Sequence, residues 1–396
     1  MNINTPLALL GNLTPQTFMQ RYWQRKPLVI RRAIPDFKPS LSIAEIKQLA
    51  RRDEVESRLI WRDGNSWKMK NGPFNRLPAA RGENWTLLAQ SVDLHDDATA
   101  ELMHRFRFIS DARLDDTMIS IASDGGGVGP HFDSYDVFLL QAHGQRRWRI
   151  SSQKDLALAP GLPLKILENF RAEHEYILDP GDMLYLPPHI AHDGVAIGDC
   201  MTISIGFRAP SLATLAQGML DAAGDRIMAS LGDGGGAQAQ SVLPGPDLSK
   251  TFRDAGAPAT ATPAYLPDAL ITAACKAAQQ IHFNDALATR FLGQWLTELS
   301  PQAYFEPSSP HIDLSSNTPP GRLQLDRCTR LMYRKRQMFI NGEALALPAS
   351  KALRQLADAR SLRLDPRRRS GLSHDEKAVL TAWLQEGWLH HIEDRQ

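Results

Sequence analysis

Residues 125–150, GGGVGPHFDSYDVFLLQAHGQRRWRI, decide the fold of the first half of the chain. A glycine-rich turn comes directly before His131 and Asp133, and two runs typical of β-strands follow. Alternate side chains of a strand point to the same face, so these two are expected to project together, about 7 Å apart along the strand. One imidazole nitrogen and one carboxylate oxygen could then bind a single metal ion, although an HxD pair alone also arises by chance in long chains.

A second segment, DPGDMLYLPPHIAHDG at residues 179–194, supplies a further candidate ligand. His189 and His192 come just after a predicted strand that ends in two prolines. Two histidines and one carboxylate form the facial triad of non-haem Fe(II) oxygenases, which leaves coordination positions open for a co-substrate and oxygen. On the residues alone, either histidine can complete the triad. The alternative is a set of polar residues that are satisfied inside a β-barrel.

The composition predicts a globular protein of the cytoplasm. At 396 residues the chain is long enough for two or three domains, and 43% apolar and 22% charged residues are ordinary values for a globular protein. The formal charge of +1 predicts no strong attraction to nucleic acid or to a membrane. Cys200, Cys275 and Cys328 form no CxxC pair, which fits a reducing compartment. We expect neither a signal peptide nor a membrane span, because the chain lacks a long apolar run.

Residues 1–208 are expected to form a mainly β catalytic domain. Short runs rich in Val, Ile, Leu, Phe and Tyr alternate with Gly, Pro and Asp turns. Strands of this length with regular turns are typical of a β-barrel or a sandwich. The predicted strands include KPLVIRR (26–32), DTMISIAS (116–123), DVFLLQA (136–142), RRWRISS (146–152), DMLYLPP (182–188) and CMTISIGF (200–207).

Residues 209–300 are expected to form a helical linker segment. Apolar residues recur at helical spacing in a first run at 211–231 and in a second run at 267–299. Between these runs, a Gly/Ala/Pro-rich insertion at 232–262 indicates a loop. The helices have too much apolar surface to stand alone, so we expect them to pack on each other or on a second chain.

Residues 301–396 are expected to form a small α+β module of winged-helix type. Asn341-Gly342 lies between two β-type runs, which predicts a tight hairpin. One helix is predicted over 350–360. Another is predicted to begin after Ser373, which has the spacing of a capping box with Glu376.

Three motifs of the chain resemble a known family. They are YWQRKPLVIRRA at 22–33, GPHFDSYDVFLLQAHGQRRWRI at 129–150 and PGDMLYLPPHIAHDG at 180–194. They resemble the JmjC-type members of the cupin superfamily, which are double-stranded β-helix oxygenases that use Fe(II) and 2-oxoglutarate. The resemblance implies that His131, Asp133 and His192 hold the metal ion, and it leaves His189 as a spectator.

The resemblance also implies a place for 2-oxoglutarate. In the family, a basic residue fifteen positions after the first histidine binds the distal carboxylate, and that residue is Arg146 in this chain. A guanidinium suits the role because it can bind a carboxylate through two parallel hydrogen bonds. Arg147 and Arg149 are expected to face the other way on the strand. Ser120 could add a hydroxyl group to the same anion.

Polar side chains are predicted on the inner face of the barrel. Tyr135 has the parity of the HxD pair, Asp116 and Met118 share one face of a predicted strand, and Ser204 is polar in another. An acid, an aromatic ring and a hydroxyl suit a cationic planar group such as a guanidinium. The alternative is a buried Asp116 that pairs with a neighbouring arginine.

The order of the three regions resembles that of the bacterial ribosomal oxygenases. This resemblance implies a homodimer built on the middle helices, and hydroxylation of the β-carbon of an arginine in large-subunit ribosomal protein sixteen. It also implies that Asp116, Met118, Tyr135 and Ser204 contact the substrate, with no catalytic residue beyond the metal ligands. The insertion at 232–262 departs from the family pattern because it is longer than expected.

Two other functions compete with this interpretation. The first is another JmjC-type protein hydroxylase or a lysine demethylase, for which an aromatic cage or a differently placed acid is expected. The second is a ligand-sensing cupin joined to a winged helix that binds DNA. The basic run at 367–369 supports the second, but such runs are more often solvated loops, so nucleic acid is not expected as a partner. A zinc hydrolase would need a general base that the sequence does not reveal.

Overall fold

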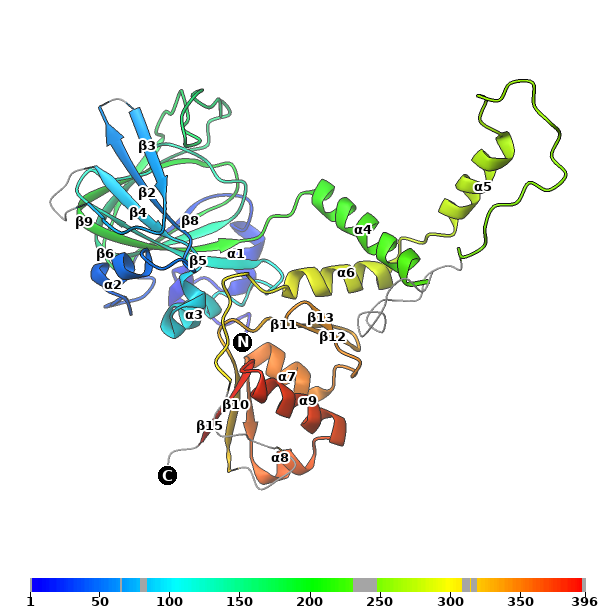
Figure 1. The fold of residues 1–396 in the computed structure, drawn as a ribbon. Helices are drawn as coiled ribbons and strands as arrows, with labels where there is room; N and C mark the ends of the chain where they lie inside the picture. The colour runs from blue at the N-terminus through cyan, green and yellow to red at the C-terminus, as the bar shows by residue number, and fades with distance from the viewer. Residues whose placement is uncertain are drawn as a thin grey trace. The chain divides into compact units, whose positions relative to one another are not determined.

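The computed structural model describes residues 2–64, 66–78, 84–230, 248–307, 314 and 319–393. The chain divides into two compact units, Met1–Ala209 and Pro210–Gln396. Unit 1 holds the strand-rich half of the chain, and unit 2 holds the helices α4 to α9 with the remaining strands (Figure 1). None of the helices in the described ranges combines the length and the hydrophobicity that crossing a bilayer requires.

Among the described residues of unit 1, nine strands form one antiparallel sheet that curls on itself (Figure 1). The strand order is β1-β8-β6-β9-β5-β4-β2-β3, and β7 pairs with the far half of β6. The mainly β architecture predicted from the sequence is therefore confirmed. The strands are β1 (Leu28–Ile30), β2 (Ser57–Asp63), β3 (Ser66–Asn71), β4 (Trp85–Ala89), β5 (Leu114–Ala122), β6 (Val137–Ser151), β7 (His174–Leu178), β8 (Met183–Leu186) and β9 (Ala191–Phe207).

The two longest strands, β6 and β9, pair along most of their length and bend together. The sequence predicted two separate runs at 136–142 and 146–152, but the structure joins them in one 15-residue strand. The register shifts between Gln141 and Gln145, where Gly144 has a φ of 61°. A Cβ on Gly144 would lie 2.0 Å from the carbonyl oxygen of Asp199, so only glycine allows this close approach.

Short helices begin at polar caps and cover the sheet. Thr14, Ser42 and Asp96 each accept a hydrogen bond from the backbone N–H three residues further on, which fixes where the helices begin. Those helices are α1 (Pro15–Arg21), α2 (Ile43–Leu49) and α3 (Asp97–His104), with single 3-10 turns η1 (Ala8–Leu10) and η2 (Val92–Leu94).

An aromatic cluster fills the core of unit 1. The Phe18 ring lies 5.4 Å from that of Phe138 and 5.0 Å from that of Tyr185, between ring centroids, and Phe106 packs on Phe138 at 4.8 Å. All four side chains are fully buried. The cluster anchors the beginning of β6 and the end of β8, which are the strands that flank the candidate metal ligands.

Unit 2 begins with α4 (Leu212–Ser230), α5 (Asp268–Gln279) and α6 (Asp285–Thr297). The helix predicted at 211–231 is confirmed, whereas the run predicted at 267–299 is two helices. Asn284 explains the interruption, because its side chain accepts a hydrogen bond from the backbone N–H of Leu287 at 3.0 Å and caps a new helix. Most of the insertion predicted at 232–262 lies outside the described residues, and 248–262 contains no helix or strand.

The C-terminal part of unit 2 forms the predicted winged-helix-like module. Asn341 and Gly342 have φ values of 49° and 87°, which a type I′ hairpin turn requires. Ser373 and Glu376 form the predicted capping box. The arginines at 367–369 lie on a short helix and not on a loop, which corrects the prediction. The elements are β10 (Gly321–Leu325), β11 (Leu331–Arg334), β12 (Gln337–Ile340), β13 (Glu343–Ala344), α7 (Lys351–Ala359), β14 (Ser361–Leu364), α8 (Pro366–Ser370), α9 (His374–Gln385) and β15 (Leu389–Glu393).

Candidate metal centre

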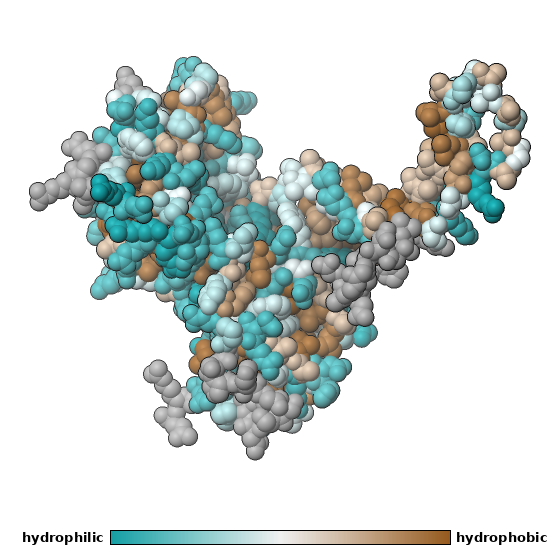
Figure 2. Space-filling view, viewed as in Figure 1, coloured by the Kyte–Doolittle hydropathy of each residue, from teal (hydrophilic) through white to brown (hydrophobic). Residues whose placement is uncertain are grey.

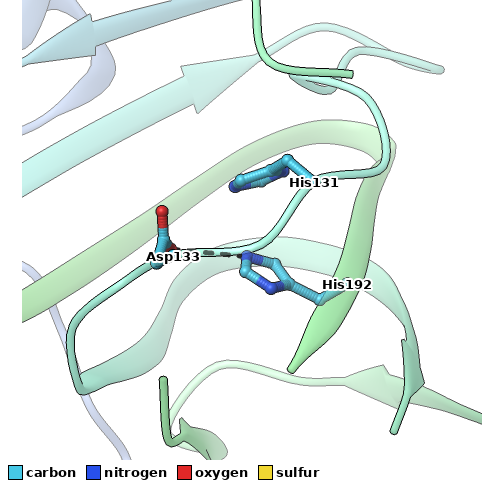
Figure 3. A group of neighbouring side chains, drawn as sticks. All are labelled: His131, Asp133 and His192. Atoms are coloured by element: carbon cyan, nitrogen blue, oxygen red, sulfur yellow. Dashed lines mark ion pairs between the residues drawn. The ribbon is translucent and has the colours of Figure 1, made fainter. Parts of the chain in front are cut away.

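His131, Asp133 and His192 converge on one point of unit 1 (Figure 3). One potential ligand atom from each of the three lies within 4.8 Å of the other two. Nε2 of His192 is 3.7 Å from Oδ2 of Asp133, and the two imidazole rings are 4.2 Å apart between centroids. Two imidazole nitrogens and one carboxylate at this separation can bind one metal ion on a single face.

Two chain segments that are far apart in the sequence hold this group together. His131 and His192 form an isolated antiparallel bridge, in which each backbone N–H donates to the carbonyl oxygen of the other residue at 2.9 and 2.7 Å. Beyond this bridge, residues 132–135 belong to no strand, so the prediction that the HxD pair lies within a strand is wrong. The backbone N–H of His189 donates to the carbonyl oxygen of Asp133 at 2.7 Å and fixes the loop instead.

The structure separates the two candidate histidines of the second segment. His192 lies at the beginning of β9 and is buried, whereas His189 is exposed and does not join the cluster. The φ of His189 is 65°, a value in the left-handed region where non-glycine residues are uncommon. His189 therefore contributes its backbone to the site, not its imidazole.

Backbone carbonyls orient both imidazoles. Nδ1 of His131 lies 2.8 Å from the carbonyl oxygen of Gly129, and Nδ1 of His192 lies 2.9 Å from that of Ile190. A carbonyl oxygen can only accept, so Nδ1 carries the proton in each ring and Nε2 keeps a free lone pair. Burial and the neighbouring His131 lower the pKa of His192 to about 4, against an opposing effect of Asp133. The ring is therefore neutral at neutral pH, the form that binds a metal ion.

Arg146 lies on the same face of β6 as the contacts of His192. Its neighbours on that face are Trp148 and Ile150, and Ile150 is directly opposite His192 in the β6–β9 register. The Trp148 ring is 5.9 Å from the His192 ring, and the Arg146 guanidinium carbon is 5.7 Å from Trp148. Gly194 makes room for this tryptophan, because a Cβ there would lie 2.6 Å from its ring. Trp148 therefore lies close to both Arg146 and His192, and it links the arginine to the candidate metal centre.

The buried donors of this region lack partners. Arg146 is 3% exposed, and its Nε donates to the Sγ of Cys200 at 3.4 Å. Among the residues that the structure describes, its Nη2 has no hydrogen-bond partner, nor does Nε1 of the buried Trp148. Buried donors without acceptors are costly, so two of them in one place fit an anion that binds there. Trp148 was not singled out in the sequence, although its parity with Arg146 could have revealed it.

The other arginines of β6 have different surroundings. Arg149 forms an ion pair with Asp193 at 2.5 Å, and Arg147 lies next to Arg146 and therefore on the opposite face. Ser120 is buried on β5 opposite Thr202, and its hydroxyl donates to the carbonyl oxygen of Thr202 at 3.4 Å. The structure does not bring this hydroxyl into hydrogen-bond contact with Arg146.

The predicted substrate residues lie on neighbouring strands and on the HxD loop. Met118 and Ser204 are direct partners in the β5–β9 register, and Asp116 lies two residues before Met118 on β5. Tyr135 belongs to no strand and is 40% exposed, so its parity argument does not apply. Burial raises the pKa of Tyr135, and so do the carboxylates of Asp133 and Asp116, which places its hydroxyl near both acids.

Asp116 is satisfied by neutral donors. Its Oδ2 accepts hydrogen bonds from Nε2 of Gln90 at 3.0 Å, from the backbone N–H of Ser91 at 3.1 Å and from the Ser91 hydroxyl at 3.3 Å. Among the residues that the structure describes, no basic side chain forms an ion pair with Asp116, so the alternative of an arginine-paired acid is not found. Burial, followed by the charge of Asp115, raises the pKa of Asp116.

Next to the loop that carries His131 and Asp133, a buried network of hydrogen bonds supports the beginning of β6. The sequence did not reveal this network. Asp136 is fully buried and accepts hydrogen bonds from the Tyr185 hydroxyl at 2.6 Å and from Nε2 of Gln24 at 3.1 Å. Arg113 adds an ion pair at 3.5 Å. These partners come from three separate segments, and no local pattern links them to Asp136.

Fold and site together define the class of protein. The family model for the JmjC domain matches residues 101–215, and the model for the ROXA-like winged helix matches residues 277–390. The chain therefore carries a JmjC-type cupin domain followed by a winged-helix domain of the ROXA-like type.

Individual proteins are similar to part of the chain. The chain is 40% identical over 205 residues to the ribosomal protein uL16 3-hydroxylase of Escherichia coli (strain K12), a match that covers 52% of this chain and 55% of that protein. It is 36% identical over 221 residues to a probable ribosomal oxygenase of Haemophilus influenzae, which covers 54% of each. The match thus spans about half the length of these two relatives.

Solved structures match over a much larger share. The X-ray structure of E. coli YcfD matches with a TM-score of 0.77 and 28% identity, and covers 96% of this chain and 98% of that chain. A structure described as the E. coli ribosomal oxygenase YcfD in complex with cobalt and 2-oxoglutarate matches with a TM-score of 0.76, 28% identity and the same coverage.

Proposed function

We propose that the protein is an Fe(II)- and 2-oxoglutarate-dependent hydroxylase that acts on a ribosomal protein. The observation that carries the proposal is the convergence of His131, Asp133 and His192 within 4.8 Å in a JmjC domain. The similarity to a uL16 3-hydroxylase and to YcfD, one of whose structures contains cobalt and 2-oxoglutarate, supports the same activity.

The donor set of the metal centre fits iron(II). We assign His131, Asp133 and His192 as its ligands, because two neutral imidazoles and one carboxylate on one face leave the remaining coordination positions open. Iron(II) held by these residues would supply oxidising chemistry, in which one atom of dioxygen enters a substrate C–H bond and the other goes to 2-oxoglutarate as it is converted to succinate and CO2. The carbonyls of Gly129 and Ile190 keep the two Nε2 atoms aimed at the metal position.

The unpartnered donors next to this centre fit 2-oxoglutarate. We assign Arg146 as the residue that binds the distal carboxylate, because its guanidinium is buried and one nitrogen lacks an acceptor. Nε1 of Trp148, whose ring lies beside the Arg146 guanidinium, is a second donor without a partner among the described residues. Ser120 is proposed as a further contact, on the strand next to Cys200, whose sulfur holds Arg146.

The substrate group is proposed to be an arginine side chain. Asp116, Met118, Tyr135 and Ser204, here called the cation pocket, supply an acid, a thioether, an aromatic ring and a hydroxyl. Asp116 is half-buried and has no basic partner among the described residues, so a substrate cation would neutralise it. Because one relative is described as a ribosomal protein uL16 3-hydroxylase, the target is proposed to be an arginine of large-subunit ribosomal protein sixteen, hydroxylated at its β-carbon.

The residues of the chain orient the reactants and take no part in acid–base chemistry. The cation pocket holds the far end of the substrate side chain and so fixes which carbon faces the metal. Arg146 fixes the opposite end of the co-substrate. Holding both reactants in one geometry contributes to catalysis by removing their translational and rotational freedom. No proton needs to pass through a side chain of the site.

We further propose a homodimer in the cytoplasm, where ribosomal proteins are made. Large apolar side chains of α4 and α5 are exposed, and Figure 2 shows apolar surface over these helices. A second copy of the chain would cover these exposed side chains. The exposed side chains are Leu212, Leu220, Met228, Leu270 and Ile271. Light scattering at rising protein concentration tests the dimer, and a monomer at all concentrations would rule it out.

Intact-mass analysis tests the activity and its target together. Ribosomal proteins are incubated with the protein, Fe(II), 2-oxoglutarate and oxygen, and a mass increase of one oxygen atom is expected on one protein. Fragmentation then locates the modified residue. A histidine or lysine target would favour the other JmjC-type activities, and one relative, at 25% identity, is described as a bifunctional lysine-specific demethylase and histidyl-hydroxylase.

A further inference from the structure

The two carboxylate oxygens of Asp116 have opposite surroundings. Oδ2 accepts all three hydrogen bonds, from Gln90 and Ser91. Oδ1 has no hydrogen-bond partner among the residues that the structure describes. A Cβ at Gly206 on β9 would lie 3.3 Å from Oδ1, so the glycine keeps a side chain away from this oxygen. One oxygen is saturated and the other remains available.

A register break in β5 turns Asp116 toward these donors. The pairing of β5 with β9 is interrupted between Leu114 and Thr117, which is the position of Asp116. Such irregularities re-aim side chains next to functional sites. Ser91 has a φ of 51°, and its N–H and hydroxyl both reach Oδ2.

Gln90 lies between Asp116 and the guanidinium of Arg58 and forms a hydrogen bond with each. The amide oxygen of Gln90 accepts a hydrogen bond from Nη2 of Arg58 at 3.1 Å, and its amide nitrogen donates to Asp116 at 3.0 Å. Arg58 lies on β2, Gln90 directly follows β4, and Asp116 lies on β5, so the three side chains follow adjacent strands across the sheet. The guanidinium also fixes the amide orientation, because only the oxygen of the amide can accept from it.

We propose that Gln90 is a positioning and specificity residue for the substrate: it binds Arg58 and Oδ2 of Asp116 at once, and so reserves Oδ1 for a cationic substrate side chain. This inference rests on the proposed function. A neutral amide fixes the plane of the carboxylate without neutralising its charge. Without that amide, only Ser91 would hold Oδ2, and Asp116 could pair with Arg58, which would weaken the attraction for the substrate cation.

Ser204 completes the geometry for a planar group. It lies two positions before Gly206 on β9, on the same face as Met118. Its side chain is therefore about 7 Å along the strand from the position of Gly206, next to which Oδ1 lies. A guanidinium, whose N–H groups point in several directions, suits two separated acceptors better than a compact ammonium does.

The test compares Gln90→Met with Gln145→Met. Methionine keeps the length of glutamine but removes both amide hydrogen bonds. Gln145 is the matched control, because its amide also donates to a carboxylate, that of Asp179 at 2.7 Å, in an exposed position outside the site. Each iron-loaded variant is assayed with a peptide that contains one arginine, and with the same peptide in which citrulline keeps the shape but not the charge.

For Gln90→Met, KM for the arginine peptide is expected to rise about tenfold with kcat within about twofold, as for loss of one hydrogen bond to a charged group. KM for the citrulline peptide is expected to stay the same, so the preference for arginine falls. Gln145→Met should match the wild type on both peptides. Consumption of 2-oxoglutarate without peptide reports on the metal and co-substrate sites, and it should not change in either variant.

The outcomes separate this inference from the function on which it rests. A wild-type protein that prefers arginine, with the same preference in Gln90→Met, overturns the role of Gln90 alone. An equal rise of KM for both peptides also overturns it, because a general structural defect would act in that way. If Gln90→Met does not fold, Gln90→Ala takes its place. A wild-type protein that consumes no 2-oxoglutarate overturns the proposed function itself.

Discussion

The metal centre and the cation pocket are held in different ways, although both lie in unit 1. Backbone groups orient the metal ligands: carbonyls bind the Nδ1 atoms of His131 and His192, and a backbone bridge joins the two residues. Asp116 is oriented largely by side chains, the Gln90 amide and the Ser91 hydroxyl, together with one backbone N–H of Ser91. A site held by the backbone keeps its geometry when neighbouring side chains change, whereas a site held by side chains can be retuned by single substitutions. Under the proposed function, the oxidation chemistry depends on the first arrangement and the choice of substrate on the second.

The largest effect is expected from removal of a metal ligand. His192→Ala should abolish 2-oxoglutarate turnover and weaken metal binding by more than about 100-fold, because even partners outside the ligand set contribute 10–100-fold. Metal content and turnover are the measurements. His189→Gly is the matched control in the same loop, and it should retain turnover because glycine adopts the left-handed backbone without strain. The opposite pattern, with His189 essential and His192 dispensable, would contradict the assignment.

The next effect concerns the co-substrate. Arg146→Met should raise KM for 2-oxoglutarate about 100-fold, because a buried bidentate contact with a carboxylate is lost. Arg147→Met, on the opposite face of the same strand, should change KM by less than about twofold. Titration of 2-oxoglutarate under turnover measures both. Similar values for the two variants would show that the face of β6 was assigned incorrectly.

A third prediction concerns stability beneath the cation pocket. Asp93 is 3% exposed, its Oδ1 accepts from the backbone N–H of Thr117 at 2.7 Å, and burial together with Asp116 raises its pKa from 3.8 to about 7. The folded state therefore binds this proton more tightly than the unfolded state does. The free energy of unfolding should fall as the pH rises from about 4 to about 7.

Asp93→Asn should remove that dependence, because the amide is neutral at every pH and its oxygen can still accept from Thr117. The variant should be more stable than the wild type above pH 7 by about 1–3 kcal/mol, an order-of-magnitude value. Urea unfolding across this pH range measures it. A wild type whose stability rises with pH in this window would contradict the prediction.

The smallest effect is expected two hydrogen bonds away from the substrate. Arg58→Met should raise KM for the arginine peptide only about threefold, because Gln90 loses its orienting partner but keeps its own contact with Asp116. An effect larger than that of Gln90→Met would mean that Arg58 acts directly on the substrate. Steady-state kinetics with both peptides distinguish these cases.

The sequence predicted the parts of the site that depend on local spacing. The HxD pair and the late histidine were identified from their spacing and from family resemblance, and the structure brings their side chains together. The conformation around them was not predictable in the same way. Residues 132–135 leave the strand because His189 binds the carbonyl of Asp133, a contact set by chain segments that are far apart.

The residues that were missed share one property: register across strands defines them. Arg58 bonds to Gln90, and Gln90 to Asp116, only because β2, β4 and β5 are neighbours. Trp148 lies next to His192 only because β6 pairs with β9. A single sequence contains no information on register at this level. The prediction of one helical run at 267–299 was wrong for a different reason. Asn284 caps a new helix within an apolar pattern that is continuous in the sequence.

The bridge between His131 and His192 has a consequence for biosynthesis. A growing polypeptide that has emerged only as far as Asp133 contains two of the three ligands. It lacks His192, whose backbone pairs with that of His131. Tight iron capture must therefore wait until β9 has been translated and has paired with β6. The nascent chain thereby meets a redox-active ion only after the fold around the three ligands has formed.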